Sequence, residues 1–211
     1  MVSFVIIGRN EASFLRDCLN SVLNAIKEQK IETDSIIYVD SNSKDSSLRI
    51  AAEFQQVKVV KLEGELNAAV ARNIGASFTK GDKICFLDAD MQLNSKFFSL
   101  ENIATRDCII SGEVIDVNLD DGLRVLNCIP RYKVLAKERR IVLGGVFIID
   151  RSNWEKLGGM NTKYRRSQDI DFGLRSSGLH FELFRLPEII AYHYTIPYRS
   201  IRRTYNMLLN G

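Results

Sequence analysis

The sequence predicts an α/β fold in which a mostly parallel central sheet is flanked by helices. Apolar runs of strand length alternate with segments of helical periodicity up to residue 90, and three of these runs end in polar turns. This alternation is typical of a parallel, doubly wound sheet. Right-handed crossovers place the carboxyl ends of its strands along one edge, where ligands bind in such folds.

Residues 1–90 account for most of the predicted sheet. Residues 2–7 form a continuous apolar run, the pattern of a strand that is covered on both faces. A polar turn follows at 8–11, and apolar side chains then recur at helical spacing from Phe14 to Ile26. The predicted strands are 2–7, 36–39, 57–62 and 84–87, and the predicted helices are 14–26, 45–54 and 66–78.

The alternation breaks after Asp107, and the second half is predicted to be mixed. Residues 118–140 are rich in charge and remain unassigned. No linker or internal repeat separates the halves, so we expect a single domain over residues 1–211. Strands are expected at 108–117, 141–150 and 189–194, with an alternating segment at 179–184 and helices at 153–157 and 168–176.

The bulk properties are those of a soluble globular protein. The chain has 211 residues, a mass of 24.0 kDa and a net charge of +3 without a basic stripe, so we expect no binding to nucleic acid. Its four cysteines lie far apart without a CxxC pair, which favours free thiols and a reducing cytoplasm. We expect neither a signal peptide nor a membrane span, because the longest nearly apolar run is 141–149 and a span needs roughly 20 residues.

Two acidic residues, Asp88 and Asp90, follow the fourth apolar strand. At the ligand-binding edge their carboxylates can hold a hard divalent cation that bridges phosphate oxygens. A solvated turn is the alternative interpretation, since Asp120-Asp121 forms an acidic pair without this context. The turn at 8–11 is not GxGxxG and no GxxxxGK[ST] occurs, which excludes a Rossmann dinucleotide site and a P-loop.

Several separated motifs together resemble the family 2 glycosyltransferases of GT-A fold. These motifs cover nearly the whole chain and lie at 5–11, 39–45, 71–75, 81–90, 154–159 and 168–175. The resemblance implies a Rossmann-like, mostly parallel central sheet with a smaller mixed part on the acceptor side. It divides the domain into a nucleotide-binding half (1–90), an acceptor-side half (91–196) and a C-terminal helix (197–211).

The resemblance also implies roles for individual residues, all of them transferred from matching motif positions. Asp90 would be the main protein ligand of Mn²⁺ or Mg²⁺, and Asp169 would be the catalytic base. The residues implied in donor binding are Gly8, Arg9 and Glu11 beside the nucleotide, Asp40 at the base, Arg72 near the donor, and Asp88 with Ala89 at the ribose or sugar.

The chemistry implied by this resemblance is inverting transfer of a sugar from an NDP-sugar, with UDP the expected nucleotide, to a hydroxyl of a saccharide or lipid-linked acceptor. Synthesis of a bacterial surface polysaccharide or glycolipid is the expected context. The sequence departs from the family at Gln168, where an acidic residue is usual, and at Arg9, where many members have an aromatic one. Asp169 has a second interpretation, as a helix N-terminal carboxylate that favours the macrodipole.

Three features of the sequence each allow two interpretations. His193 is either a further metal ligand, as in some relatives, or a structural residue between tyrosines. Gly144-Gly145 either allows close backbone approach on the acceptor side or forms a flexible turn. The amphipathic segment 198–209 either rests on anionic lipid at the inner face of the membrane or packs on the domain or a second subunit.

Two other functions remain as alternatives at this stage. The first is a sugar-phosphate nucleotidyltransferase, which has a similar sheet and paired carboxylates, although no glycine-rich basic loop follows the first strand. The second is a non-catalytic relative that only binds a nucleotide-sugar. Gln168 favours this second alternative, while Asp88, Asp90 and Asp169 favour an enzyme.

Overall fold

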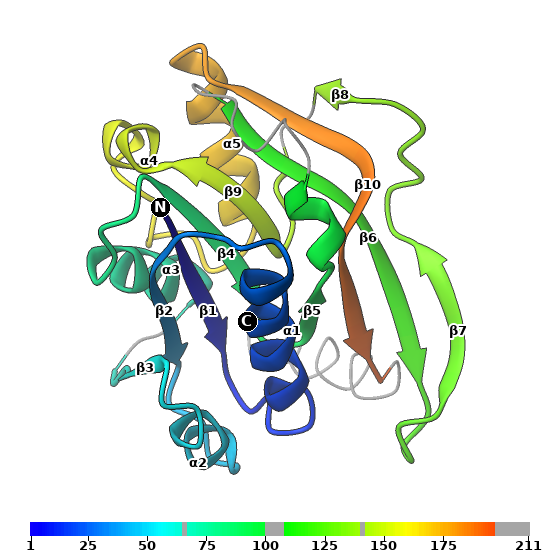
Figure 1. The fold of residues 1–211 in the computed structure, drawn as a ribbon. Coiled ribbons are helices and arrows are strands. Elements are labelled where there is room, and N and C mark those ends of the chain that lie inside the picture. The colour runs from blue at the N-terminus through cyan, green and yellow to red at the C-terminus, as the bar shows by residue number, and fades with distance from the viewer. Residues whose placement is uncertain (65–66, 100–107, 140–141, 197–211) are drawn as a thin grey trace.

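The computed structural model describes residues 1–64, 67–99, 108–139 and 142–196, and a mixed sheet runs through this part of the chain (Figure 1). Its strands are β1 (Val2–Gly8), β2 (Thr33–Asp40), β3 (Val57–Lys61), β4 (Lys83–Asp88), β5 (Met91–Leu93), β6 (Cys108–Leu119), β7 (Val125–Pro130), β8 (Glu138–Arg139), β9 (Val146–Asp150) and β10 (Glu182–Thr195). Their order is β3-β2-β1-β4-β9-β6-β10-β5, with β7 paired to β6 and β8 to β10. The fold is therefore α/β, as the sequence predicts.

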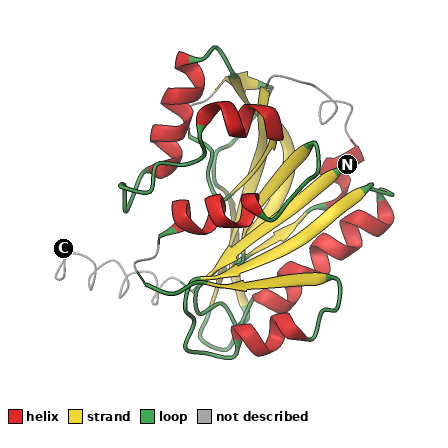
Figure 2. Ribbon diagram, turned by 90° about the vertical axis from the view of Figure 1, so that its left-hand side faces the viewer, coloured by secondary structure: helices red, strands yellow, loops and turns green. Residues whose placement is uncertain are grey.

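Helices cover both faces of this sheet (Figure 2). They are α1 (Leu15–Glu28), α2 (Ser47–Ala52), α3 (Ala68–Ser77), α4 (Arg151–Leu157), α5 (Gln168–Gly178) and the 3₁₀ helix η1 (Ser95–Ser99). The helices α1, α2 and η1 pack into one apolar core, and α3, α4 and α5 pack into the other. Successive side chains from Phe4 to Ile7 in β1 alternate between the two cores, which explains why this part of the strand is apolar without interruption.

The parallel pairing of β1 with β2 and β4 confirms the parallel sheet predicted for residues 1–90. Gly8 lies beside Asp40 in the register with β2, and Ile7 lies beside Asp88 in the register with β4. Three polar turns that are far apart in sequence therefore meet at one edge of the sheet. This edge is where the sequence predicts a ligand site.

The second half differs from the sequence-based expectation in its strands. The strand expected at 141–150 begins only at Val146, because Gly144 has a φ of 75°, outside the strand region. Residues 182–184 of the segment expected at 179–184 and the strand expected at 189–194 belong to one long strand, β10, while residues 179–181 follow the end of α5. The register of β10 on β6 shifts between Leu186 and Ile189, around Pro187, which has no N–H to donate to the ladder.

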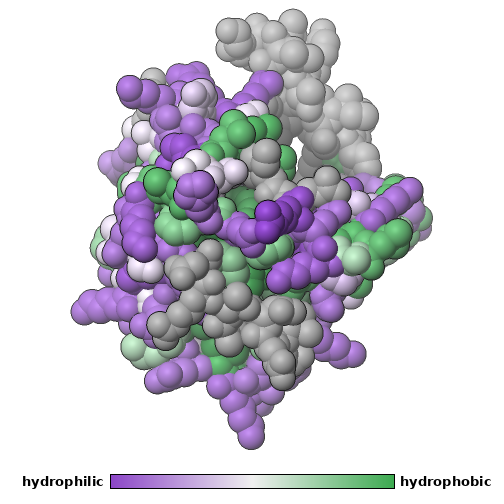
Figure 3. All heavy atoms as spheres, turned by 90° about the horizontal axis from the view of Figure 1, so that it is seen from above, coloured by the Kyte–Doolittle hydropathy of each residue, from purple (hydrophilic) through white to green (hydrophobic). Residues whose placement is uncertain are grey.

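The unassigned segment 118–140 contains strands β7 and β8 rather than only a loop. All six residues of β7 are exposed, so the strand lacks the alternation of buried and exposed positions that would reveal it in the sequence. Seen from above, the described surface is mostly hydrophilic, with apolar side chains at the right-hand edge, the side on which β7 and β8 lie (Figures 1 and 3).

In the described ranges, no helix is long and apolar enough to cross a membrane. The C-terminal helix expected at 197–211 lies outside the described residues, as does residue 66 at the expected start of α3. All four cysteines are free thiols, and Cys128 on β7 is the exposed one.

Helix α3 packs closely on the sheet at Gly75. A Cβ atom at this position would lie 2.3 Å from Cγ1 of Val5 and 3.0 Å from Cγ2 of Val39, both of which are fully buried. Neither valine can move without disturbing the core of β1 and β2. The close contact explains why a glycine stands in the middle of a helix, where it costs about 1 kcal/mol relative to alanine.

We predict that Gly75→Ala lowers the free energy of unfolding by about 1–3 kcal/mol, because the added methyl group overpacks the interface between α3 and the sheet. Urea denaturation followed by circular dichroism measures this change. Gly178→Ala is the matched control, since no heavy atom beyond its chain neighbours and its own helix backbone lies within 4 Å of its Cβ position. Equal stability of Gly75→Ala and wild type would contradict the close packing.

Candidate active site

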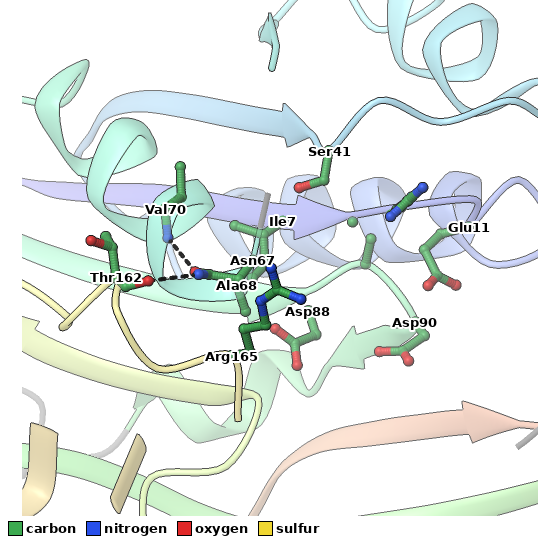
Figure 4. Close-up of a pocket in the computed structure, with 13 residues that line it drawn as sticks. Ile7, Glu11, Ser41, Asn67, Ala68, Val70, Asp88, Asp90, Thr162 and Arg165 are labelled. Carbon is green, nitrogen blue, oxygen red and sulfur yellow. Dashed lines mark hydrogen bonds between the residues drawn. The ribbon is translucent and has the colours of Figure 1, made fainter. Parts of the chain in front are cut away.

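A cavity of about 750 Å³ lies at the carboxyl edge of β1 and β4 (Figure 4). This volume is typical of a site for a small molecule or cofactor. Six residues predicted to contact the donor or the metal line it, namely Gly8, Arg9, Glu11, Asp88, Ala89 and Asp90. The other lining residues are Ile7, Ser41, Asn67, Ala68, Val70, Thr162 and Arg165.

One side of the cavity consists of two turns that hydrogen-bond to each other. The backbone N–H of Asn10 donates to Ser43 Oγ at 2.8 Å. The side-chain Oδ1 of Asn10 accepts from the N–H of Lys44 at 2.7 Å. The N–H of Ala12 donates to Asp45 Oδ2 at 3.0 Å. Burial raises the pKa of Asp45, but its hydrogen bonds lower the pKa by more, so the net shift is downward. The turn after β1 is therefore fixed to the turn after β2.

Asp40 lies at the predicted edge but is fully buried and is not among the residues that line the cavity. Its Oδ1 accepts from the backbone N–H of Ser43 at 2.8 Å, and the hydroxyl of Tyr38 donates to its Oδ2 at 3.2 Å. Burial, with the neighbouring charge of Asp40, raises the pKa of Tyr38 and keeps this hydroxyl protonated. The contact of Asp40 with a nucleotide base stays a prediction.

Asp88 is held from two sides. Arg72 Nη2 donates to Asp88 Oδ1 at 2.6 Å, and the arginine side chain is only 6% exposed. Gly145 lies on the other side, where a Cβ atom would be 2.5 Å from Asp88 Oδ2, and its carbonyl accepts from the N–H of Asp88 at 3.0 Å. Desolvation and the nearby Asp90 raise the pKa of Asp88, while Arg72 lowers it, and the net shift is upward. The backbone at Gly145 therefore lies directly against Asp88 and is not a flexible turn.

Asp90 and His193 face each other at the same edge. Asp90 Oδ2 lies 3.4 Å from His193 Nε2, and the backbone oxygen of Asp90 accepts from the N–H of Tyr194 at 2.9 Å. Oδ1 of Asp90 is buried and has no hydrogen-bond partner among the described residues. Burial lowers the pKa of His193, but its contacts with Asp90 and Asp116 raise the pKa by more. The structure thus brings together the two predicted metal ligands.

These residues fit a divalent cation that shares its coordination with a bound ligand. Neighbouring ligand atoms of an octahedral ion at about 2.1 Å are about 3 Å apart, close to the 3.4 Å between Asp90 and His193. The unpartnered Oδ1 of Asp90 is a further free acceptor. In the described part of the chain, no group of three or more His, Cys, Asp or Glu residues could hold a metal. A cation held by Asp90 and His193 would need further oxygen ligands from a bound molecule or from water.

Asp169 lies in the first turn of α5 and is not among the residues lining the cavity. It is partly exposed, and its carboxylate has no hydrogen bond or ion pair with any residue that the structure describes. The second acidic residue of this turn, Asp171, is paired with Arg175 at 2.9 Å. Gln168, where the sequence departs from the family pattern, is buried and its Nε2 donates to the carbonyl of Tyr164 at 2.7 Å. This amide holds the loop that precedes the helix.

The residues that fix this loop were not predicted from the sequence. The Asn73 side chain accepts from the N–H of Met160 and donates to its carbonyl, both at 2.8 Å. Asn67 Nδ2 donates to the carbonyl of Thr162 at 2.9 Å (Figure 4). Arg165 extends from the same loop into the cavity on the side of Asp88 (Figure 4). The loop from the second half is thus fastened to α3 and brings a cation to the predicted donor site.

The structure also places two unpredicted residues, Asp116 and Arg131, against His193. They lie 77 and 62 residues away from it in sequence, so no local pattern connects the three. Arg165 could have been suspected from the basic stretch at 163–166, and Asn73 from its place in the motif at 71–75.

We predict that Gly145→Ala weakens binding of a nucleoside diphosphate with Mn²⁺ about tenfold or more, because the methyl group displaces the Asp88 carboxylate from its contact with Arg72. Isothermal titration calorimetry measures the affinity. Gly178→Ala serves again as the control for a distant methyl group. A folded Gly145→Ala variant with unchanged affinity would show that the position of Asp88 is not needed for binding.

Comparison with known proteins connects this site to a family. The family model "Glycosyl transferase family 2" matches residues 3–125, which is more than half of the chain. The glycosyltransferase AmsB of amylovoran biosynthesis in Erwinia amylovora is 27% identical over 196 residues. This alignment covers 82% of the chain and 64% of AmsB, so the chain spans less than two thirds of this relative.

Solved structures share the fold at low sequence identity. The crystal structure of GalNAc-T7 with UDP, GalNAc and Mn²⁺ has a TM-score of 0.74 and 19% identity, covering 93% of this chain and 44% of that one. Staphylococcus aureus TarS 1–349 in complex with UDP has a TM-score of 0.71 and 17% identity, with 93% and 61% covered. Both are similar to the chain over its central sheet and flanking helices. The chain has the GT-A fold and belongs to glycosyl transferase family 2.

Proposed function

We propose that the chain is the catalytic part of a metal-dependent, inverting glycosyltransferase that uses an NDP-sugar. The observation that carries this proposal is that Asp88 and Asp90 line a cavity of about 750 Å³, that His193 lies 3.4 Å from Asp90, and that a buried oxygen of Asp90 lacks a partner among the described residues. UDP is the favoured nucleotide, since GalNAc-T7 and TarS are both crystallised with it. Mn²⁺ or Mg²⁺ is the expected ion.

The acceptor we propose is a hydroxyl of a saccharide or lipid-linked saccharide in bacterial surface polysaccharide or glycolipid synthesis. The role of AmsB in amylovoran biosynthesis supports this context. The family match favours sugar transfer over the nucleotidyltransferase alternative. The cytoplasmic location, the contact of the C-terminal segment with the inner face of the membrane and the formation of a homodimer stay predictions.

The leaving diphosphate carries most of the negative charge that develops in such a reaction. When bound, the divalent ion would neutralise this charge. Asp90 and His193 would hold the ion, and Arg165, which reaches the cavity from the fixed loop, would contribute a second positive charge. Arg72 would keep Asp88 oriented toward the donor. Catalysis would then rest on charges that are positioned before the substrate binds.

We assign the catalytic base to Asp169. The acceptor hydroxyl would transfer its proton to this carboxylate while its oxygen attacks the anomeric carbon, and the bond from that carbon to the diphosphate oxygen would break with its electron pair leaving on the diphosphate. In-line attack inverts the anomeric configuration. The pairing of Asp171 with Arg175 supports the assignment, because it leaves Asp169 as the carboxylate of this turn without a partner in the described chain.

We expect UDP to raise the thermal midpoint of the wild type only when Mn²⁺ is present, and to have no such effect on Asp90→Ala. A ligand at about 100 times its Kd stabilises the folded state by about 2.7 kcal/mol, and the ion connects the diphosphate to Asp90. A thermal-shift panel of nucleoside diphosphates and NDP-sugars makes the measurement. Asp121→Ala, at the exposed tip between β6 and β7, is the matched acidic control. If no nucleotide stabilises the wild type, or if Asp90→Ala responds equally, the donor site is wrongly assigned.

The Asp169→Asn variant should bind UDP and Mn²⁺ normally but turn over about 10²–10⁴ times more slowly, because an amide cannot accept the acceptor's proton. Release of UDP is measured with an acceptor identified by screening saccharides and lipid-linked saccharides. Asp171→Asn, which breaks the pair with Arg175, separates loss of the base from general loosening of α5. Full activity of Asp169→Asn would assign the base to another residue.

A further inference from the structure

His193 is held on the side facing away from Asp90 by a carboxylate and a guanidinium group. Its Nδ1 lies 2.7 Å from Asp116 Oδ1 and 2.6 Å from Arg131 Nη2. Arg131 Nε donates to both oxygens of Asp116 at 3.1 Å, and its Nη2 contacts Oδ1 as well. These three side chains are between 20% and 26% exposed, so most of each is withdrawn from solvent.

The strand pairing explains why these residues meet. His193 on β10 lies directly beside Asp116 on β6 in the parallel register. Strand β7 then runs back along β6, and the N–H of Arg131, one residue beyond β7, donates to the carbonyl of Val114 at 2.8 Å. The six side chains of β7 are exposed and add little to the core. The clearest contribution of this hairpin to the site is to carry Arg131 to Asp116.

Imidazole can bind a metal through Nε2 only if that nitrogen carries no proton. We infer that Asp116, held in place by Arg131, keeps the His193 proton on Nδ1 and so presents Nε2 beside Asp90 as a metal ligand. The inference rests on the proposed metal-dependent function. Of the two groups beside Nδ1, Arg131 has donors only, so Asp116 Oδ1, which also accepts from Arg131, is the group to which an Nδ1–H would donate. The opposite arrangement, in which Nδ1 accepts from Arg131 and Nε2 carries the proton, is the one that the inference excludes.

Nitrogen-15 NMR of the imidazole rings in the metal-free protein tests the inference directly. The chain has two histidines, so exposed His180 is an internal reference for the signals of His193. At a pH where both rings are neutral, we expect the proton of His193 on Nδ1 in the wild type and a shift of the population toward Nε2–H in Asp116→Ala. A wild-type ring protonated on Nε2, or the same tautomer in both proteins, would overturn the inference.

The metal affinity gives a second readout. Titration of Mn²⁺ in the presence of UDP, followed by electron paramagnetic resonance, should show binding about 10–100 times weaker in Asp116→Ala. Asp116→Asn, whose amide oxygen can still accept from Nδ1, should recover part of the affinity and serves as the test variant if the alanine variant does not fold. The control is Asp150→Ala, which removes a similarly buried carboxylate from its pair with Lys83 at the opposite end of β4.

These outcomes separate the inference from the proposed function. Wild-type protein that binds no Mn²⁺ with UDP contradicts the proposed metal-dependent function, whatever the tautomer of His193. Equal Mn²⁺ affinity of the wild type and both Asp116 variants contradicts the inference alone. If Asp150→Ala loses as much Mn²⁺ affinity as Asp116→Ala, the effect of Asp116 is explained by general destabilisation. This result would also contradict the inference.

Discussion

The parallel pairing of β1 with both β2 and β4 is the constraint on which the rest of the site depends. It aligns Ile7 with Asp88 and Gly8 with Asp40, so the turns after these strands meet at one edge. Hydrogen bonds between the backbone and side chains of the turns then fix them to each other. The two apolar cores on either side of β1 maintain this alignment, because a shift of one residue would exchange the side chains that face each core.

The second half of the chain completes the site through β10. This strand pairs with β5, the short strand directly after Asp90, and the N–H of Tyr194 donates to the carbonyl of Asp90. The pairing places His193 beside Met91, and the His193 side chain lies 3.4 Å from Asp90, although these residues come from different halves of the sequence. The loop held by Asn67 and Asn73 provides a second connection between the halves at the other side of the cavity. A donor bound between these connections would contact both halves at once.

The sequence predicts the first half of the fold well because its strands are buried on both faces and its turns are polar. It predicts part of the cavity lining for the same reason, since strand ends locate Gly8, Asp88 and Asp90. The sequence pattern does not predict β7, which buries neither face. It predicts two separate segments where the structure has the single strand β10, with the break around Pro187. Asp116 and Arg131 could not be found from sequence spacing, because only the register of β10, β6 and β7 brings them to His193.

We propose that a divalent ion and a nucleoside diphosphate share the edge formed by Asp90 and His193. Diffraction at the manganese absorption edge, from crystals of the protein grown with Mn²⁺ and UDP, can locate both. We expect one anomalous peak within coordination distance of an Asp90 oxygen, of His193 Nε2 and of the UDP diphosphate. UDP bound in this cavity without such a peak, or manganese bound away from Asp90, would contradict a shared site for the ion and the nucleotide.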